Sequence, residues 1–165
     1  MRFARGDLVT VFDAEDRPDP NQLLKCARLF ASAPAPVGCV QARLAVDHAE
    51  ETFFTRQFAP EYATLFDILL PWMAGRELLL PLGGTSNHFR RRVLEDCGGW
   101  YPYNVTEDID IGIHLMRDGW RIFTVESITW EEAPLTFFAW LNQRVRWHKG
   151  WLQTWLVHMR SPRQL

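Results

Sequence analysis

The chain has 165 residues, 47% hydrophobic content and eight tryptophans, which predicts one folded domain with a sizeable core and argues against disorder. Its formal net charge of −2 provides no general attraction to nucleic acid, so no nucleic-acid partner is expected. Three scattered cysteines, without a CxxC pair, indicate neither a zinc site nor a disulfide framework. No stretch approaches the roughly 20 apolar residues of a spanning helix, so we expect a segment that is soluble or lies on a membrane surface.

The first half of the chain alternates β-prone runs with helical patterns. Residues 8–12 form a short apolar run that predicts a buried strand ending in acids. Asn21 is a typical N-cap for the helix that follows. Residues 37–46 predict a second strand, and residues 51–74 predict one long helix, or two helices broken at Pro60.

The second half continues the alternation. A glycine-rich turn at 83–87 precedes a helix from Thr106 to about Arg117, and residues 120–125 predict another strand. Pro134 suits the first turn of a helix through Trp147, which Gly150 would break. Strands that alternate with helices favour an α/β layered fold with a mainly parallel sheet.

Two carboxylates follow the first predicted strand. Asp13 and Glu15 come directly after Phe12, and ligands in layered α/β folds bind at the carboxyl ends of strands. Because hard cations take carboxylate and phosphate oxygens, the pattern predicts a Mg²⁺ or Mn²⁺ site that would hold a diphosphate and stabilise a departing nucleotide. The alternative is a solvated acidic loop, in which Asp16 caps the turn.

A second acidic cluster, Thr106-Glu107-Asp108, stands where a helix is expected to begin. Ordinary capping explains these residue types, because Thr is an N-cap and acids favour the positive end of a helix. The functional interpretation makes Asp108 the general base that takes the proton of an attacking hydroxyl. Glu107 would then support the base or bind the acceptor.

A third cluster lies on the last predicted helix. Gln143, Arg146 and Trp147 stand at i, i+3 and i+4 and therefore share a face. Arginine binds diphosphate oxygens in pairs, and an indole ring offers a platform for a sugar. The alternative is a packed tryptophan among solvent-exposed arginines. Residues 148–160 suit either a core-facing helix or a basic helix lying on a membrane, and we prefer the membrane.

Taken together, the chain resembles family-2 inverting glycosyltransferases, and more narrowly the membrane-associated cellulose synthase and hyaluronan synthase type. Residues 13–16 match the metal motif, 106–108 the base motif and 143–147 the QxxRW motif. The loop that contains Gly84 and Thr85 is similar to the family's loop near the acceptor sugar. Two features depart from the family: the metal motif is DxE rather than DxD, and the upstream nucleotide-binding strands and flanking transmembrane helices are missing.

The resemblance implies the C-terminal portion of a GT-A fold over residues 1–165, as a partial catalytic domain that is inactive alone. It also implies metal-dependent, inverting transfer of a sugar from a nucleotide diphosphate donor to a saccharide or lipid-linked acceptor. The expected place is the cytoplasmic face of the inner membrane, in polysaccharide or glycoconjugate synthesis. Two alternatives remain open: a metal-dependent nucleotidyltransferase, which does not need the QxxRW face, and a non-catalytic domain that binds nucleotide-sugar or scaffolds a synthase.

Overall fold

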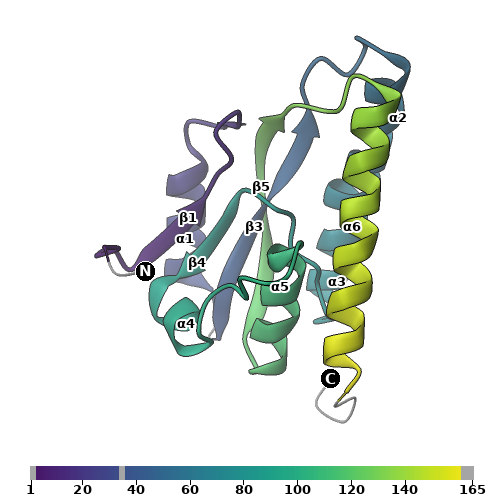
Figure 1. The fold of residues 1–165 in the computed structure, drawn as a ribbon. Helices are drawn as coiled ribbons and strands as arrows, with labels where there is room; N and C mark the ends of the chain where they lie inside the picture. Colours follow the sequence, from purple (N-terminus) through teal and green to yellow (C-terminus); the bar gives the residue numbers. More distant parts are fainter. Residues whose placement is uncertain (1–2, 34–35, 161–165) are drawn as a thin grey trace.

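The computed structural model describes residues 3–33 and 36–160. Its elements are, in order, β1 (Leu8–Val11), β2 (Arg17–Pro18), α1 (Gln22–Ser32), β3 (Val37–Val46), α2 (Phe53–Ala63), the π-helical segment η1 (Thr64–Leu69), α3 (Leu70–Gly75), β4 (Asn87–Arg90), α4 (Arg91–Asp96), α5 (Glu107–Arg117), β5 (Arg121–Glu131) and α6 (Phe137–His158) (Figure 1). The predicted strand at 37–46 is confirmed, whereas the one predicted at 120–125 is longer and reaches the cavity described below.

The strands form one five-stranded sheet in the order β1-β4-β3-β5-β2. The α/β fold is confirmed, but the expectation of a mainly parallel sheet is wrong in detail. β3 and β5 pair in parallel, and the pairings of β1 with β4, β3 with β4 and β2 with β5 are antiparallel. The sheet is therefore mixed.

The direction of β4 follows from the path of the chain before it. The helices α2, η1 and α3 carry the chain back to the start of β3: Glu77 forms an ion pair with Arg121, which lies opposite Val37. The segment 78–83 then runs back along β3 as far as its middle, where the Gly83 amide donates to Gln41 Oε1. Because this return precedes β4, the strand enters the sheet antiparallel to β3.

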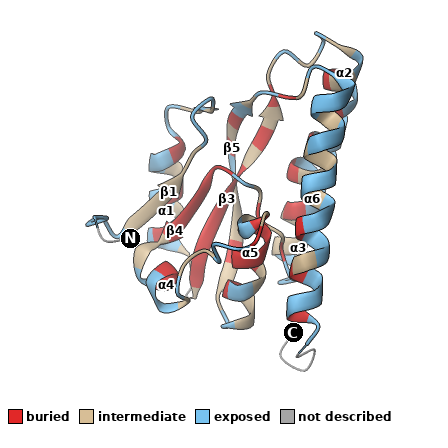
Figure 2. Ribbon diagram, in the orientation of Figure 1, coloured by how far each residue is buried: buried red, intermediate tan, exposed pale blue. Residues whose placement is uncertain are grey.

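Helices cover both faces of the sheet. On one face, a small cluster of Cys26 and Phe30 of α1 packs against Val37 and Val40 of β3. The larger core lies on the other face, under the helical segment 53–75 and α5, with α6 outermost (Figures 1 and 2). Within the described residues, no helix has the length and apolarity to cross a membrane.

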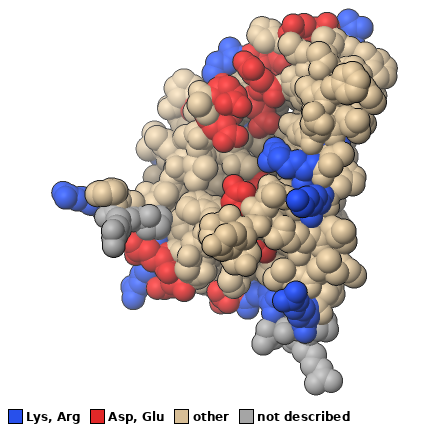
Figure 3. Space-filling view, in the orientation of Figure 1, with Lys and Arg blue, Asp and Glu red and all other residues tan. Residues whose placement is uncertain are grey.

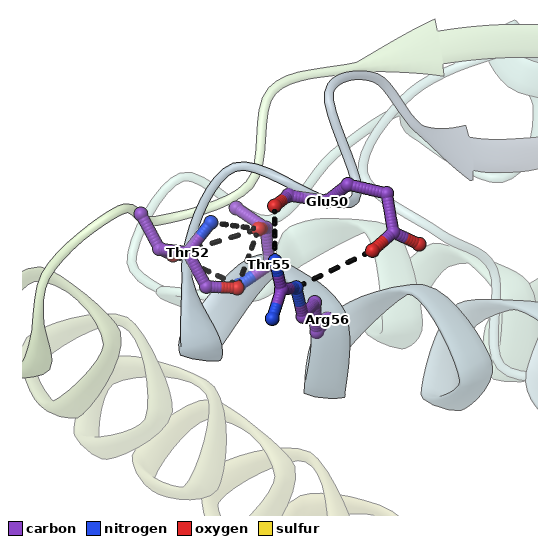
Figure 4. A network of polar contacts seen from close by, with 4 residues as sticks. All are labelled: Glu50, Thr52, Thr55 and Arg56. Carbon is purple, nitrogen blue, oxygen red and sulfur yellow. Dashed lines mark hydrogen bonds and ion pairs between the residues drawn. The ribbon is translucent and has the colours of Figure 1, made fainter.

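The helical segment 53–75 is continuous, so the predicted break at Pro60 does not occur. Thr52 and Thr55 form a reciprocal capping box at its start, beside an ion pair between Arg56 and Glu50 (Figure 4). Proline removes one backbone donor, and the chain widens shortly afterwards into η1, where the Leu70 amide donates to Leu65. This widened turn brings Leu65 and Phe66 to the cavity described below.

The last helix also differs from prediction at both marked residues. Pro134 lies before α6 rather than in its first turn, and the side chain of Thr136 caps the helix by accepting from the Ala139 amide at 3.3 Å. Gly150 is buried inside α6 and does not break it. A Cβ at Gly150 would lie 2.1 Å from Thr106 Oγ1, so the missing side chain lets α6 touch the start of α5. The segment from 148 onward is therefore a continuation of one rigid helix.

Candidate active site

One cavity of about 340 Å³ brings the three predicted clusters together. It lies beyond the ends of β1 and β5 and is closed on one side by α6. The nine site residues predicted from the sequence all line it: Asp13, Glu15, Gly84, Thr85, Glu107, Asp108, Gln143, Arg146 and Trp147. Their roles remain predictions. Because all nine line one cavity, the interpretation of the three clusters as unrelated surface features is excluded.

The acidic turn after β1 is held in shape by short local bonds. The Asp13 amide donates to Asp16 Oδ2 at 2.8 Å, and the Asp16 amide returns a bond to the Asp13 carbonyl at 3.2 Å. Asp16 therefore closes the turn, as predicted for a capping Asp. The Thr85 hydroxyl makes a short bond to the same Asp16 oxygen, which ties the turn to the glycine-rich loop. Asp13 and Glu15 remain exposed at the cavity.

The glycine-rich loop is fixed by the buried side chain of Gln41. Its amide group donates to the Thr85 carbonyl at 3.0 Å, and its Oε1 accepts from the Gly83 amide at 2.8 Å. A Cβ at Gly84 would lie 3.4 Å from Asp108 Oδ2, so the loop backbone lies directly against that carboxylate. The loop and the candidate base therefore form one wall of the cavity.

Asp108 stands in the first turn of α5, as predicted, but Thr106 makes no capping bond there. The Thr106 hydroxyl is buried without a hydrogen-bond partner, because its side chain is pressed against Gly150 of α6. Asn104 supplies the missing link: it accepts from the Thr106 amide at 3.2 Å and donates to Thr154 of α6 at 2.8 Å. The position of Asp108 is thus set by contact with α6 as much as by its own helix.

The cavity is strongly acidic on the side of the β-strand ends. Burial, together with the charge of the neighbouring Glu107, raises the pKa of Asp108 to about 6. Burial also raises the pKa of Asp13, followed by the charges of Asp16, Glu15 and Glu107, whereas the charge of Arg146 lowers it. In Figure 3, acidic side chains gather on the upper part of the visible face, with basic side chains over α6 beside them. Electrostatic repulsion among these carboxylates favours a cation in the cavity.

The acidic turn fits a divalent cation that is shared with a phosphate ligand. Among the residues that the structure describes, no three His, Cys, Asp or Glu side chains are placed to hold a metal ion by themselves. Hard cations such as Mg²⁺ commonly use one or two carboxylates together with substrate phosphates. Asp13 and Glu15 match that donor set, and the buried Asp16 Oδ1 has no hydrogen-bond partner.

On α6, the predicted face points into the cavity. Gln143, Arg146 and Trp147 all line it, and the Trp147 ring packs against Phe58 of α2 at a centroid distance of 5.9 Å. Gln143 Oε1 is buried without a partner, so it remains available to a ligand donor. Across the cavity, Arg146 is close enough to act on the pKa values of both Asp13 and Asp108.

Sequence reasoning missed two residues of this site, Glu131 and Trp151. Glu131, at the end of β5, accepts a hydrogen bond from Tyr62, and burial raises its pKa to about 7. Trp151 lines the cavity one turn beyond Trp147 and is 48% exposed. A four-residue spacing from Trp147 marks Trp151 in the sequence, whereas Glu131 had no signal, because the strand was predicted to end at 125.

Comparison with known proteins places the chain among sugar transferases. A family model described as glycosyl transferase family group 2 matches residues 8–165. The chain is 32% identical over 161 residues to a beta-monoglucosyldiacylglycerol synthase of Trichormus variabilis, covering 94% of this chain and 33% of that protein. It is 30% identical over 153 residues to the probable glycosyltransferase YdaM of Bacillus subtilis, covering 89% of this chain and 35% of that protein.

A plant protein and a solved structure extend the similarity. A probable glucomannan 4-beta-mannosyltransferase of Arabidopsis thaliana is 28% identical over 145 residues, covering 87% of this chain and 26% of that protein. The mannosyltransferase PcManGT from Pyrobaculum calidifontis, solved with GDP-Man and Mn²⁺, superposes with a TM-score of 0.70 at 20% identity. That match covers 96% of this chain and 41% of the other, and it confirms the predicted GT-A type of fold. The chain spans about a third of the length of the curated relatives it matches.

Proposed function

The chain belongs to glycosyl transferase family group 2, and from that premise we propose that it transfers a sugar from a nucleotide diphosphate donor to a hydroxyl group. The observation that carries the proposal is the shared cavity of Asp108, the acidic turn and the QxxRW face. A nucleotidyltransferase would need only the acidic turn, so the third cluster favours sugar transfer. The relatives named as glucosyl and mannosyl transferases support the same class of reaction.

The donor would lie between the acidic turn and α6. Asp13 and Glu15 would hold Mg²⁺ or Mn²⁺, which neutralises charge on the leaving diphosphate when it is bound. Arg146 faces the same space and would bind the diphosphate oxygens with paired N–H donors. Mn²⁺ in complex with GDP-Man in PcManGT supports a metal-assisted donor, although Mg²⁺ suits the same ligands.

Asp108 would act as the general base of a single displacement. The acceptor oxygen forms a bond to the anomeric carbon while the bond from that carbon to the diphosphate breaks. The acceptor proton passes to Asp108, and the nucleotide diphosphate leaves with the electron pair. Attack from the face opposite the leaving group inverts the anomeric centre. A carboxylate whose pKa is about 6 is suited to this task, because it is ionised at neutral pH and still basic.

The acceptor would approach along α6, over the Trp147 and Trp151 rings. We propose a saccharide or lipid-linked acceptor used in polysaccharide or glycoconjugate synthesis, and a relative named for a glycosyldiacylglycerol product supports the lipid-linked form. Beyond Trp151, the outer face of α6 exposes Leu152, Trp155 and Leu156, each at more than half of its surface. These side chains support the proposed place on the cytoplasmic face of the inner membrane.

Calorimetric titration with UDP and GDP, with and without Mn²⁺, tests the donor site. We expect binding that requires the metal and that Asp13→Ala removes, because the variant loses a cation ligand. Arg91→Ala, which alters an ion pair on α4 away from the cavity, is the control and should bind as the wild type does. Metal-independent binding would contradict the proposal. No binding at all would favour the non-catalytic scaffold, and pyrophosphate release from a nucleoside triphosphate would favour the nucleotidyltransferase.

A further inference from the structure

The two arginines of the Gln143–Trp147 segment face different surroundings. Arg146 lines the cavity, whereas Arg144 does not line it and forms an ion pair with Glu61 of α2, which is itself part of the cavity wall. We propose that Arg144, held by Glu61, is a positioning residue that fixes the ring of Trp147 in the cavity. The role of that ring toward an acceptor rests on the proposed function, but its placement by Arg144 does not.

The ion pair joins α6 to α2 with two bonds. Both terminal nitrogens of Arg144 donate to Glu61, Nη1 to Oε1 in a short bond and Nη2 to Oε2 at 2.5 Å. The Arg144 side chain is only 16% exposed, whereas Glu61 is 50% exposed, so the arginine is largely buried and its carboxylate partner remains open to water. A bidentate pair fixes the plane of the guanidinium as well as its position.

The fixed plane matters because aromatic rings surround it. The Arg144 guanidinium carbon lies 4.8 Å from the ring centroid of Phe58, 4.9 Å from Trp147 and 5.7 Å from Trp140. Phe58 in turn packs on Trp147 at 5.9 Å. The Trp147 ring is therefore held by a cation from its own helix and by an aromatic ring from α2.

These contacts form a chain that starts outside α6. Glu61 orients the guanidinium, the guanidinium packs on Trp147, and Trp147 lines the cavity. A change at Glu61 should therefore alter the Trp147 ring even though Glu61 lies on α2 and reaches the ring only through Arg144. Such an effect distinguishes a positioning pair from an ion pair that only adds stability.

Fluorine NMR of the chain labelled with 5-fluorotryptophan tests this coupling without requiring activity. Trp147→Phe identifies the Trp147 signal by its loss. In Glu61→Gln we expect that signal to shift and broaden, because the ring loses its fixed neighbour. Arg144→Lys should behave in the same way, since lysine keeps the charge but has no planar group to stack. Glu95→Gln, which removes a bidentate partner of Arg91 on α4, is the matched control and should leave the signal unchanged.

An unchanged Trp147 signal in Glu61→Gln would overturn the proposal. A wild-type Trp147 signal in Arg144→Lys would show that the stacking contact of the guanidinium is not needed. A kinetic measurement adds an independent readout. In the complete enzyme, Arg144→Lys, which changes a residue outside the cavity lining, should raise the acceptor KM about tenfold and leave the donor KM unchanged, whereas an equal loss for both substrates would indicate a structural role alone and contradict the proposal. Absence of sugar transfer by the complete enzyme would refute the proposed function, and the NMR result would still decide the role of Arg144.

Discussion

Replacement of Gly150 by alanine tests whether the contact between α6 and α5 shapes the cavity. A Cβ at this position would lie 2.1 Å from Oγ1, 2.4 Å from Cγ2 and 2.7 Å from Cβ of Thr106. All three distances are below van der Waals contact, and the Thr106 Cβ is fixed to its backbone, so α6 must move. Overpacking costs about 1–3 kcal/mol, and a clash with a Cβ that cannot rotate away lies in the upper part of that range, at about 2–3 kcal/mol. The better helix propensity of alanine offsets about 1 kcal/mol of this cost. We expect a net loss of about 1–2 kcal/mol in the free energy of unfolding.

Thermal unfolding followed by circular dichroism measures this loss, which corresponds to a Tm lowered by about 2–8 °C for a chain of this size. Gly75→Ala is the matched control, because a Cβ at the end of α3 would meet nothing within 4 Å and should leave the Tm unchanged or raise it. Thr106→Ala in the Gly150→Ala background should recover part of the loss, since the buried Thr106 hydroxyl has no hydrogen bond to give up. A Gly150→Ala protein as stable as the wild type or more so would refute the reasoning.

Three further predictions concern charge and proton transfer. In the complete enzyme, Asp108→Asn should lower sugar transfer by about 10²- to 10⁴-fold while nucleotide binding persists, and near-normal turnover in a radiolabelled-donor assay would exclude Asp108 as the base. Because the base must be ionised and the pKa of Asp108 is about 6, the wild-type rate should fall as pH drops through about 6 and level off above it; a rate–pH profile without that inflection would contradict the assignment. Burial lowers the pKa of His88 from 6.5 to about 4, so the stability it contributes is present above pH 6.5 and is lost as pH falls toward 4. The buried carboxylates affect the wild type and His88→Gln equally, so the difference between the two proteins isolates His88. Between pH 7 and pH 5, the free energy of urea unfolding should fall by about 2 kcal/mol more in the wild type than in His88→Gln.

Strand positions followed from the sequence more readily than strand directions. The run at 37–46 contains β-branched and apolar residues that are buried in almost every position, so its identity is local information. The direction of β4 depends on residues 78–83, an apolar segment without a pairing pattern of its own. Similarly, Gly150 reads as a helix breaker by itself, and only its contact with Thr106 explains why the helix tolerates it.

The candidate site was predictable where its chemistry lies in short clusters. Asp13, Asp108 and Trp147 each stand beside residues of matching type, and the family resemblance joined them before any geometry was known. The side chains that support the site were not predictable in this way. Gln41 lies in the middle of a strand and Asn104 in an irregular loop, and each acts through partners more than 40 positions away. Tertiary contacts of that kind leave no local pattern.

The unbroken length of α6 has a structural consequence. Its 22 residues, at a rise of about 1.5 Å each, make a stiff rod of about 33 Å whose first half carries Arg146 and Trp147. Because the helix is continuous through its contact with Thr106, the exposed Trp155 and Leu156 belong to the same element as the residues that line the cavity. A partner or surface that bound those two side chains would therefore bind the element that forms one wall of the cavity.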